Sequence, residues 1–280
     1  MLRDKSPLRY PGGKSILSKF LREVIVNNNL KGGSYFELYA GGAGAALDLL
    51  YSNTVDKIVL NDADFHIYAL WKSMLDNPDA FIDKIEAINV DLNEWYKQHE
   101  IYENFKNYTL NDVGFSTFFL NRCNRSGILT KAGPIGGFEQ NGNYKIDARF
   151  NKANLIERVK MIRTFSENIE IYNCDTIDFI KKNKKLLEQS NSFMYLDPPY
   201  YKKGKTLYLN YYVHSDHEQL RDILACIRHC NWLVSYDNVR EIQDLYSDFQ
   251  NCIIELSYSL QAKRKTTEFC IYSDGIEINK

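Results

Sequence analysis

The stretch Phe193-Met-Tyr-Leu-Asp-Pro-Pro-Tyr200 joins an apolar run to a carboxylate, two prolines and an aromatic ring. The run predicts a short buried strand that ends at Asp197, because prolines lack the N–H groups that would continue a hydrogen-bond ladder. Open α/β sheets bind their ligands at the carboxyl ends of such strands. The Asp197 carboxylate and the Pro198 carbonyl can each accept a hydrogen bond from an exocyclic amino group, and the Tyr200 ring can stack on a base, a contact worth roughly 1–3 kcal/mol. A plain strand followed by a Pro-Pro turn would have the same residues, so other parts of the chain must decide between the two interpretations.

A glycine-rich loop forms a second candidate site. Residues 34–39 predict a strand, residues 40–44 (Ala-Gly-Gly-Ala-Gly) a tight loop and residues 45–51 a helix. This order allows the backbone to approach a nucleoside closely. Asp62 follows Gly42 by 20 residues, after the next predicted strand, where a carboxylate can accept hydrogen bonds from both ribose hydroxyls. The pair favours an adenosine-containing cofactor.

Two other nucleotide-binding motifs are excluded by detail. The dehydrogenase fingerprint fails because Leu47 stands where its third glycine belongs. A P-loop at Gly12-Gly-Lys-Ser15 fails because its first glycine would fall at Leu8 and no strand precedes it.

Hydrophobic periodicity divides the chain into strands and helices around an insertion. Strands are predicted at residues 57–60, 170–173, 193–196 and 232–235, with an antiparallel pair at 252–258 and 268–273. Helical periodicity covers 64–108, 115–120 and 154–166, whereas the Gly- and Asn-rich stretch 127–147 predicts a hairpin or long loop. We therefore predict an α/β fold with a doubly wound Rossmann-like sheet and antiparallel final strands. Residues 1–62 and 154–280 would form this domain, and 63–153 an inserted, mainly helical subdomain with a hairpin.

Composition indicates an intracellular globular protein. Apolar residues make up 44% and charged residues 25% of the 280, and no run approaches the roughly 18 apolar residues of a membrane span. The amino terminus has no apolar signal core, and the six cysteines include no Cys-x-x-Cys pair, so we expect reduced thiols and a cytoplasmic location. We expect no metal site, because the one ligand-like pair, His214 and His217, lies in Ser215-Asp-His-Glu218, which predicts a helix capping box.

Charge is polarised along the chain although its net value is −1. Residues 64–112 carry ten Asp/Glu against four Lys/Arg, whereas residues 121–163 carry nine Lys/Arg against three Asp/Glu. Such a distribution can present one positive face to a phosphate backbone, although charge runs are more often simply solvated surface. The basic residues of 121–149, together with the turn Asn141-Gly-Asn143, favour a two-stranded ribbon that could enter the major groove of DNA.

Four motifs in order give the chain a resemblance to a known family. They are Ser6-Pro-Leu-Arg-Tyr-Pro-Gly-Gly-Lys14, Glu37-Leu-Tyr-Ala-Gly-Gly-Ala-Gly44, Asn61-Asp62 and Asp197-Pro-Pro-Tyr200. Together they resemble the Dam-type (D12 class) site-specific adenine-N6 DNA methyltransferases over nearly the whole chain. The run Asn121-Arg-Cys-Asn-Arg-Ser-Gly127 is similar to the segment that leads into the DNA-reading hairpin of that family. The chain departs from the family pattern at Ala43, where the last glycine of the cofactor loop is expected, and in the hairpin region 133–137, so the target sequence is not implied.

The resemblance implies a Rossmann-like methyltransferase fold, S-adenosyl-L-methionine as cofactor, double-stranded DNA as substrate and, as a possible partner, a cognate restriction endonuclease. The catalytic positions would be Asp197, Pro198, Pro199 and Tyr200. The cofactor positions would be Tyr10, Lys14, Tyr39, Ala40, Gly41, Gly42, Ala43, Asp62, Asp175 and Asp197. The DNA-binding positions would be Arg122, Asn124, Arg125, Lys131, Lys145 and Arg149.

The chemistry itself can be argued from the tetrad, residues 197–200. Hydrogen bonds from an amino group to Asp197 and to the Pro198 carbonyl favour a pyramidal nitrogen whose lone pair can attack a sulfonium methyl in line, and Asp197 stabilises the charge that develops. A base in a duplex must first be flipped out, at a cost of a few kcal/mol. The same tetrad suits any planar amine or amide, so a methyltransferase acting on RNA or on a protein glutamine stays an alternative, as does a catalytically inactive DNA-binding relative. The recognition sequence and the oligomeric state stay open.

Overall fold

A computed structural model describes residues 5–9, 15–189, 191–202, 212–260 and 262–278. The chain forms two compact units. A helical unit contains residues 5–9 and 62–173, and a sheet unit contains residues 15–61 and 174–278. Residues 154–173 and the N-terminal segment thus lie with the helical unit, whereas the predicted insertion covers 63–153 alone. The assignment of functional domains stays a prediction, since compactness assigns no role.

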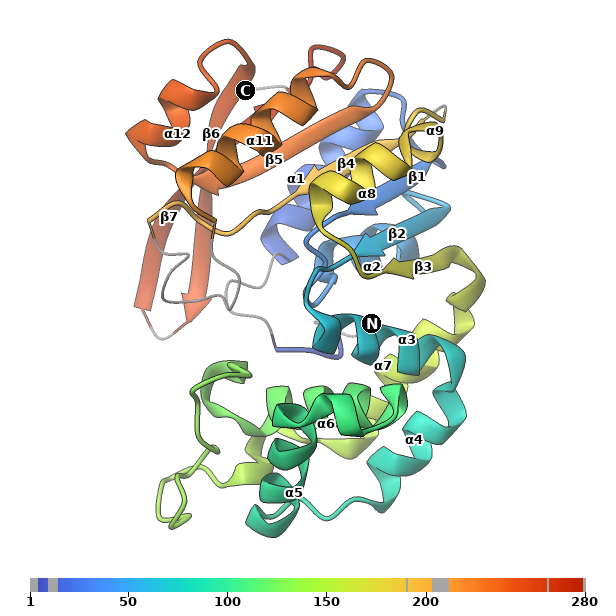
Figure 1. Cartoon of the computed structure of the whole chain (residues 1–280), viewed down its shortest axis with the longest axis vertical. Coiled ribbons are helices and arrows are strands. Elements are labelled where there is room, and N and C mark those ends of the chain that lie inside the picture. The colour runs from blue at the N-terminus through green and yellow to red at the C-terminus, as the bar shows by residue number, and fades with distance from the viewer. Residues whose placement is uncertain (1–4, 10–14, 190, 203–211, 261, 279–280) are drawn as a thin grey trace. The chain divides into compact units, whose positions relative to one another are not determined.

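The sheet has seven strands in the order β3-β2-β1-β4-β5-β7-β6 (Figure 1). Their bounds are β1 Ser34–Glu37, β2 Lys57–Asn61, β3 Ile169–Tyr172, β4 Phe193–Leu196, β5 Asn231–Asp237, β6 Gln250–Leu260 and β7 Ala262–Tyr272. β2, β1, β4 and β5 pair in parallel, and β7 pairs antiparallel with both β5 and β6. The predicted doubly wound sheet with antiparallel final strands is confirmed.

The helices of the sheet unit are α1 Ser15–Asn27, α2 Gly44–Tyr51, α8 Thr176–Lys182, α9 Lys184–Leu187, α11 His214–Ala225 and α12 Arg240–Leu245. α1 and α2 pack together on one face of the sheet, and α8 and α11 pack together on the other (Figure 1). β4 is buried along its whole length, as its continuous apolar run predicts for a central strand covered on both faces. Its first three residues pair with residues 35–37 of β1, so the segments that follow these two strands leave the sheet at the same edge.

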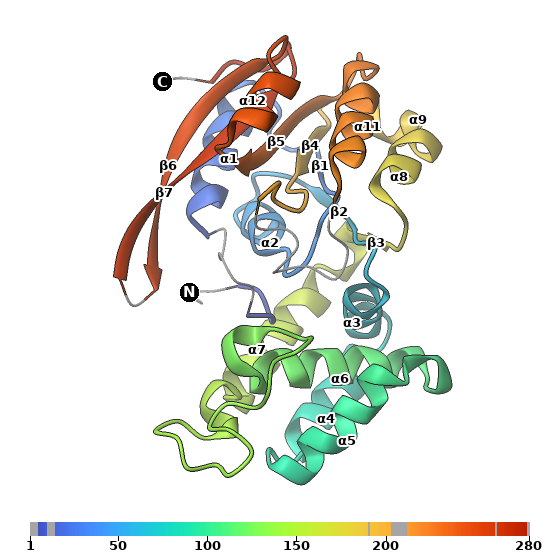
Figure 2. The ribbon, with the colours of Figure 1, turned by 60° about the vertical axis from the view of Figure 1, so that its left-hand side comes forward.

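The helical unit consists of α3 Phe65–Asp76, α4 Pro78–Ala87, α5 Leu92–Glu103, α6 Leu110–Cys123 and α7 Lys152–Thr164, with short 3₁₀ turns η1 Phe105–Asn107, η2 Arg125–Gly127, η3 Ile146–Arg149 and η4 Ser166–Asn168. α6 packs against both α3 and α5 (Figure 2). Its face turned to the interior carries Phe118 and Phe119, both fully buried. Polar side chains cap the helix starts, as Asp64 does by accepting the N–H of His66. The predicted helical character of the insertion is confirmed.

The predicted ribbon in 121–149 is wrong. Within residues 124–150, all of which the structure describes, the only β pairing is an isolated bridge between Asn124 and Pro134. Six residues with positive φ interrupt any extended run: Ser126, Gly127, Lys131, Gly136, Gly137 and Gln140. The Gln140 side chain also draws the loop together, donating to the carbonyls of Ile135 and Gly137 and accepting from the N–H of Ile146. The turn residues that predicted a hairpin therefore fold a compact loop.

One helix start also differs from its prediction. α11 begins at His214, and the Asp216 carboxylate accepts the N–H of Val213 at 2.8 Å, so the cap lies two residues before the predicted Ser215. Among the described residues, no helix is long and apolar enough to cross a bilayer.

Candidate active site

The tetrad follows β4 directly, and its prolines are buried while Asp197 and Tyr200 are partly exposed. A hydrogen-bond relay holds the Asp197 carboxylate. Its Oδ1 accepts from Ser235 Oγ at 3.3 Å, and Ser235 Oγ lies 2.7 Å from the Tyr195 hydroxyl. Since the single Ser235 proton goes to Asp197, Tyr195 donates to Ser235. Both partners are buried, and burial raises the pKa of Tyr195 well above its usual range, which keeps that proton in place.

The segment after the carboxylate is held by two more acidic residues. The Tyr200 hydroxyl donates to Oε1 of Glu268 at 2.6 Å. The backbone N–H groups of Tyr201 and Lys202 donate to the two carboxylate oxygens of Asp237 at 3.0 and 3.3 Å. The sequence interpretation assigned Tyr200 a role through its ring face alone, and the structure adds an anchor at its hydroxyl.

The glycine-rich loop after β1 is tight and buried. Gly41 and Ala43 both have φ of 45°, and the Ala43 N–H donates to the Ala40 carbonyl at 2.7 Å. Ala43 thus adopts a left-handed conformation that favours glycine, so the position keeps the backbone of the expected last glycine at a steric cost to alanine. The loop is tied to β2 by the Ala40 N–H, which donates to the Asn61 carbonyl at 3.0 Å.

The start of α2 carries no cap of its own, because Ala43 occupies the cap position and lacks a polar side chain. Glu37 supplies the missing acceptor: its Oε2 accepts the Ala46 N–H and the Tyr35 hydroxyl, both at 3.1 Å. Glu37 is only 4% exposed, so donors such as these two replace the hydrogen bonds to water that its carboxylate loses on burial. Sequence reasoning treated Glu37 as part of a motif and missed this role.

Two further polar residues join the strand ends at this edge. Asn61 is fully buried, donates to the carbonyls of Leu38 and Cys174, and accepts the Cys174 N–H. Thr176 Oγ1 donates to the Leu38 carbonyl at 3.1 Å. These bonds place Asp175, the residue before α8, beside the end of β1.

The predicted cofactor residues of the sheet unit meet at this edge. The Asp175 carboxylate caps α8 through the N–H groups of Ile177 and Asp178. The Tyr39 hydroxyl lies 2.7 Å from that of Tyr212, and burial raises the pKa of Tyr39 well above its usual range and that of Tyr212 to about 12. A glycine-rich turn with the Asp175 carboxylate beside it is a donor and acceptor set that suits an adenosine-containing cofactor.

Of the remaining predicted cofactor residues, the structure describes Asp62. Asp62 follows β2 directly, and its Oδ1 accepts the Asp64 N–H at 2.9 Å, which fixes the turn into α3. Tyr10 and Lys14 lie outside the described residues. No group of His, Cys, Asp or Glu that could hold a metal ion is found in the part of the chain that the structure describes.

The predicted DNA-binding residues divide into two sets. Arg125, Lys131, Lys145 and Arg149 are exposed. Arg122 and Asn124 are buried, and the Asn124 amide is bonded through both of its polar atoms, accepting from Trp95 Nε1 at 2.7 Å and donating to the Ile128 carbonyl at 2.9 Å. In this structure Asn124 holds the segment and does not face outward.

The N-terminal segment packs on the same turn. The Asn121 amide accepts the Arg9 N–H at 2.7 Å and donates to the Arg9 carbonyl at 2.9 Å. The Arg9 guanidinium in turn donates to the carbonyls of Arg122 and Asn124. A Cβ at Gly127 would lie 2.6 Å from the Arg9 carbonyl oxygen, and the φ of Gly127 is +75°, so this position requires glycine.

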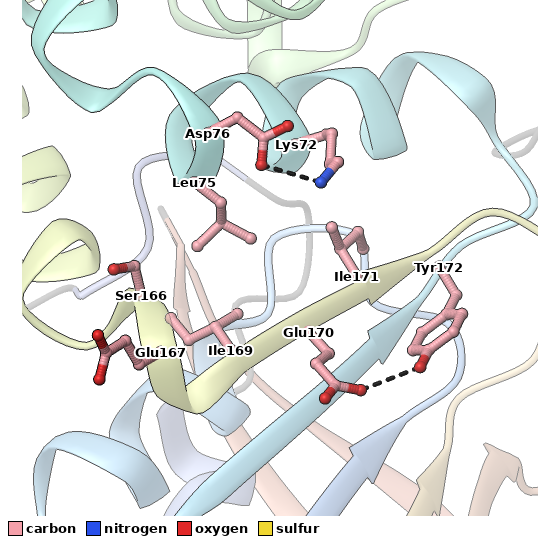
Figure 3. A pocket seen from close by; sticks show the side chains of 9 residues that line it. All are labelled: Lys72, Leu75, Asp76, Ser166, Glu167, Ile169, Glu170, Ile171 and Tyr172. Atoms are coloured by element: carbon pink, nitrogen blue, oxygen red, sulfur yellow. Dashed lines mark hydrogen bonds and ion pairs between the residues drawn. The ribbon is translucent and has the colours of Figure 1, made fainter.

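A pocket of about 490 Å³ in the helical unit contains none of the predicted site residues (Figure 3). It lies between α3 and β3. Four of its polar side chains pair with one another, Lys72 with Asp76 at 2.9 Å and the Tyr172 hydroxyl with Glu170 at 3.0 Å. We assign it no chemistry.

Comparison with known proteins identifies the family. The sequence profile of the D12 class N6 adenine-specific DNA methyltransferases matches residues 10–260. The chain is 25% identical over 232 residues to the type II methyltransferase M.MjaIII of Methanocaldococcus jannaschii, with 76% of each chain covered. It is 23% identical over an alignment of 298 residues to the type II methyltransferase M1.LlaDCHI of Lactococcus lactis subsp. cremoris, with 95% of this chain and 94% of the relative covered.

Among solved structures, the rRNA methyltransferase aviRa of Streptomyces viridochromogenes aligns with a TM-score of 0.45 and 13% identity, over 94% of this chain and 85% of that one. That distant likeness has no bearing on the substrate. The profile match extends over most of the chain and includes both the glycine-rich loop and the tetrad, and on this basis the chain belongs to the D12 class N6 adenine-specific DNA methyltransferase family.

Proposed function

We propose that the chain transfers a methyl group from S-adenosylmethionine to the N6 atom of adenine in a specific duplex DNA sequence, after flipping the base out of the helix. S-adenosylmethionine is the cofactor of this methyltransferase family. The observation that carries the proposal is the position of the tetrad at the end of β4, beside the glycine-rich loop at the end of β1. A tetrad whose acceptors suit an amino-bearing base and a turn that suits adenosine therefore share one edge of the sheet.

The tetrad would act on the amino group of the base. The Asp197 carboxylate and the Pro198 carbonyl accept its two protons as hydrogen bonds, which favours a pyramidal nitrogen with a free lone pair. The cofactor, when bound, supplies an electrophilic methyl group. Ser235 already donates to one oxygen of Asp197, so that carboxylate needs little reorientation to stabilise the charge that develops on the nitrogen. Such preorganised electrostatic stabilisation is usually the largest contribution to catalysis.

Tyr200 would hold the flipped base. Flipping costs a few kcal/mol, and stacking on an aromatic ring returns roughly 1–3 kcal/mol of it. The exposed cations of the helical unit, Arg125, Lys131, Lys145 and Arg149, provide a surface that can meet DNA phosphates or base edges.

A role in a restriction-modification pair is part of the proposal, since the two relatives reported above are named type II methyltransferases. A cognate endonuclease would then cut the same sequence when it is unmethylated. RNA and protein glutamine are less well supported as substrates, because the profile match is to a DNA methyltransferase family.

Modification-sensitive sequencing of DNA from cells that express the chain tests activity, base and sequence together. We expect N6-methyladenine within one short recurrent motif in cells with the wild-type chain and none with Asp197→Ala. Methylation of cytosine, or no DNA methylation by a folded wild-type protein, would refute the proposal.

A further inference from the structure

The tetrad is anchored by side chains from two strands that lie far along the chain. Glu268 on β7 accepts the Tyr200 hydroxyl, and Asp237 at the end of β5 accepts the two following backbone N–H groups. Both anchors are carboxylates, and the three donors named here belong to residues 200–202. The segment that would hold the base is therefore fixed from the sheet beneath it.

The strand register makes this arrangement informative. Glu268 lies directly opposite Asp237 in the antiparallel β5–β7 pair, so the two side chains share one face of the sheet. Like charges directly opposite each other destabilise a sheet. Glu268 is also only 6% exposed, and a buried carboxylate is costly unless hydrogen bonds compensate for lost water. A purely structural strand pair would be more stable with an apolar residue at one position, so these carboxylates are better explained by what they hold.

We propose that Glu268 is a positioning residue for methyl transfer, which fixes the Tyr200 ring through its hydroxyl in the orientation that stacks on the target adenine. This inference rests on the proposed function. A tyrosine side chain turns about two bonds, and a hydrogen bond at its far end removes most of that freedom. The ring is then ordered before the base arrives, which lowers the entropy lost on stacking.

The proposal separates the roles of the ring and of the hydroxyl. Tyr200→Phe retains the stacking surface but loses the anchor and leaves the buried Glu268 carboxylate without that donor. Glu268→Leu loses the anchor from the other side. Glu268→Gln keeps an acceptor oxygen at the same place, so it should retain the hydrogen bond that anchors the Tyr200 hydroxyl.

The test is a double-mutant cycle measured by methylation of a cognate duplex. We expect Tyr200→Phe and Glu268→Leu each to lower kcat by about 10- to 100-fold, the loss of one hydrogen bond to a charged group, with the double variant no worse than either single one. Glu268→Gln should stay within about threefold of wild type. KM for S-adenosylmethionine should change little in any of them. A duplex with 2-aminopurine at the target position should report less flipped base in the two damaged variants.

Two matched controls measure the generic cost of each substitution. Tyr246→Phe removes another buried tyrosine hydroxyl, and Glu255→Gln changes an exposed carboxylate on the neighbouring β6. Both should keep wild-type kcat. Should Glu268→Leu fail to fold, Tyr200→Phe alone carries the test, because its loss must exceed that of Tyr246→Phe by at least about 10-fold.

The outcomes are distinguishable. An active wild-type enzyme whose two single losses multiply in the double variant, or whose Tyr200→Phe variant matches Tyr246→Phe, would overturn the role of Glu268 and leave the proposed function intact. A wild-type protein that methylates no duplex DNA would overturn the proposed function itself, and any positioning role with it.

Discussion

Replacing Glu37 by leucine should loosen the glycine-rich loop and also weaken the binding of S-adenosylmethionine. Glu37 Oε2 accepts the Ala46 N–H at the start of α2, where Ala43 offers no cap, and also the Tyr35 hydroxyl. The leucine variant leaves both donors buried without this acceptor, since Tyr35 is fully buried and Ala46 is too.

The magnitude follows from these contacts. A buried donor that loses its acceptor costs about 1–3 kcal/mol, and loss of a negative charge at a helix start costs about 0.3–1 kcal/mol more. Against this, removing a buried charge returns part of its desolvation cost. We therefore expect the free energy of unfolding to fall by about 2–4 kcal/mol, a large fraction of the stability of a typical domain.

The assay is urea unfolding, with calorimetric titration of S-adenosylmethionine at a temperature where the variant is folded. Affinity should fall because the loop that precedes α2 is no longer fixed. Glu37→Gln is the matched control: it keeps an oxygen for the Ala46 N–H and should lose less than half as much stability. Equal losses in the two variants would show that the charge matters and not the cap. A change below about 0.5 kcal/mol in Glu37→Leu, the range of ordinary surface substitutions, would refute the reasoning.

Three further predictions concern the cofactor, the DNA and pH. Asp62→Ala should weaken S-adenosylmethionine binding by roughly 1.5–3 kcal/mol for each lost charge-assisted bond, and unchanged affinity by calorimetry would remove Asp62 from the site. Arg125→Ala should cost roughly 1–3 kcal/mol on the cognate site and narrow the gap between cognate and non-cognate methylation, whereas equal loss on all DNA would make Arg125 a phosphate contact. Burial lowers the pKa of His217 from 6.5 to about 4, so the unfolded chain binds the extra proton between those values and stability is lost as pH falls through that window. Urea unfolding should show up to about 3 kcal/mol of this loss in wild type and not in His217→Asn, and parallel pH profiles would contradict it.

The sequence predicted the features that depend on local signals. The strand Phe193–Leu196 was predicted to the residue, because an apolar run bounded by Asp197 and two prolines leaves little choice of ends. The glycine-rich loop was placed equally well, since Gly41 must turn sharply between a buried strand and a helix. Both motifs therefore reach the same edge of the sheet, as parallel neighbouring strands require.

The anchors of the tetrad could not be predicted in the same way. Glu268 lies 68 positions from Tyr200, and Ser235 lies 38 from Asp197. Their contacts depend on the β5–β7 register, and a shift by one residue would turn each side chain to the other face. Nothing in the local sequence around Glu268 fixes that register. From the sequence alone, Glu268 is therefore indistinguishable from an ordinary surface charge near the basic residues 263–265.

The basic segment 121–127 shows a different limit. A count of charges treats Arg122 and Arg125 alike. In the structure Arg122 is buried in α6, whereas Arg125 is exposed in the turn that follows. The difference arises because the chain leaves the helix at Asn124, whose amide is held between Trp95 and the Ile128 carbonyl. Ser126 then adopts φ of 57°, and the turn closes with the Gly127 N–H donating to the Asn124 carbonyl. The hydrogen bonds of the Asn124 amide and the left-handed conformation of Ser126 thus decide that Arg125, and not Arg122, reaches solvent. Residues that recognise the DNA sequence should therefore be sought first at Arg125 and on the exposed face of the folded loop.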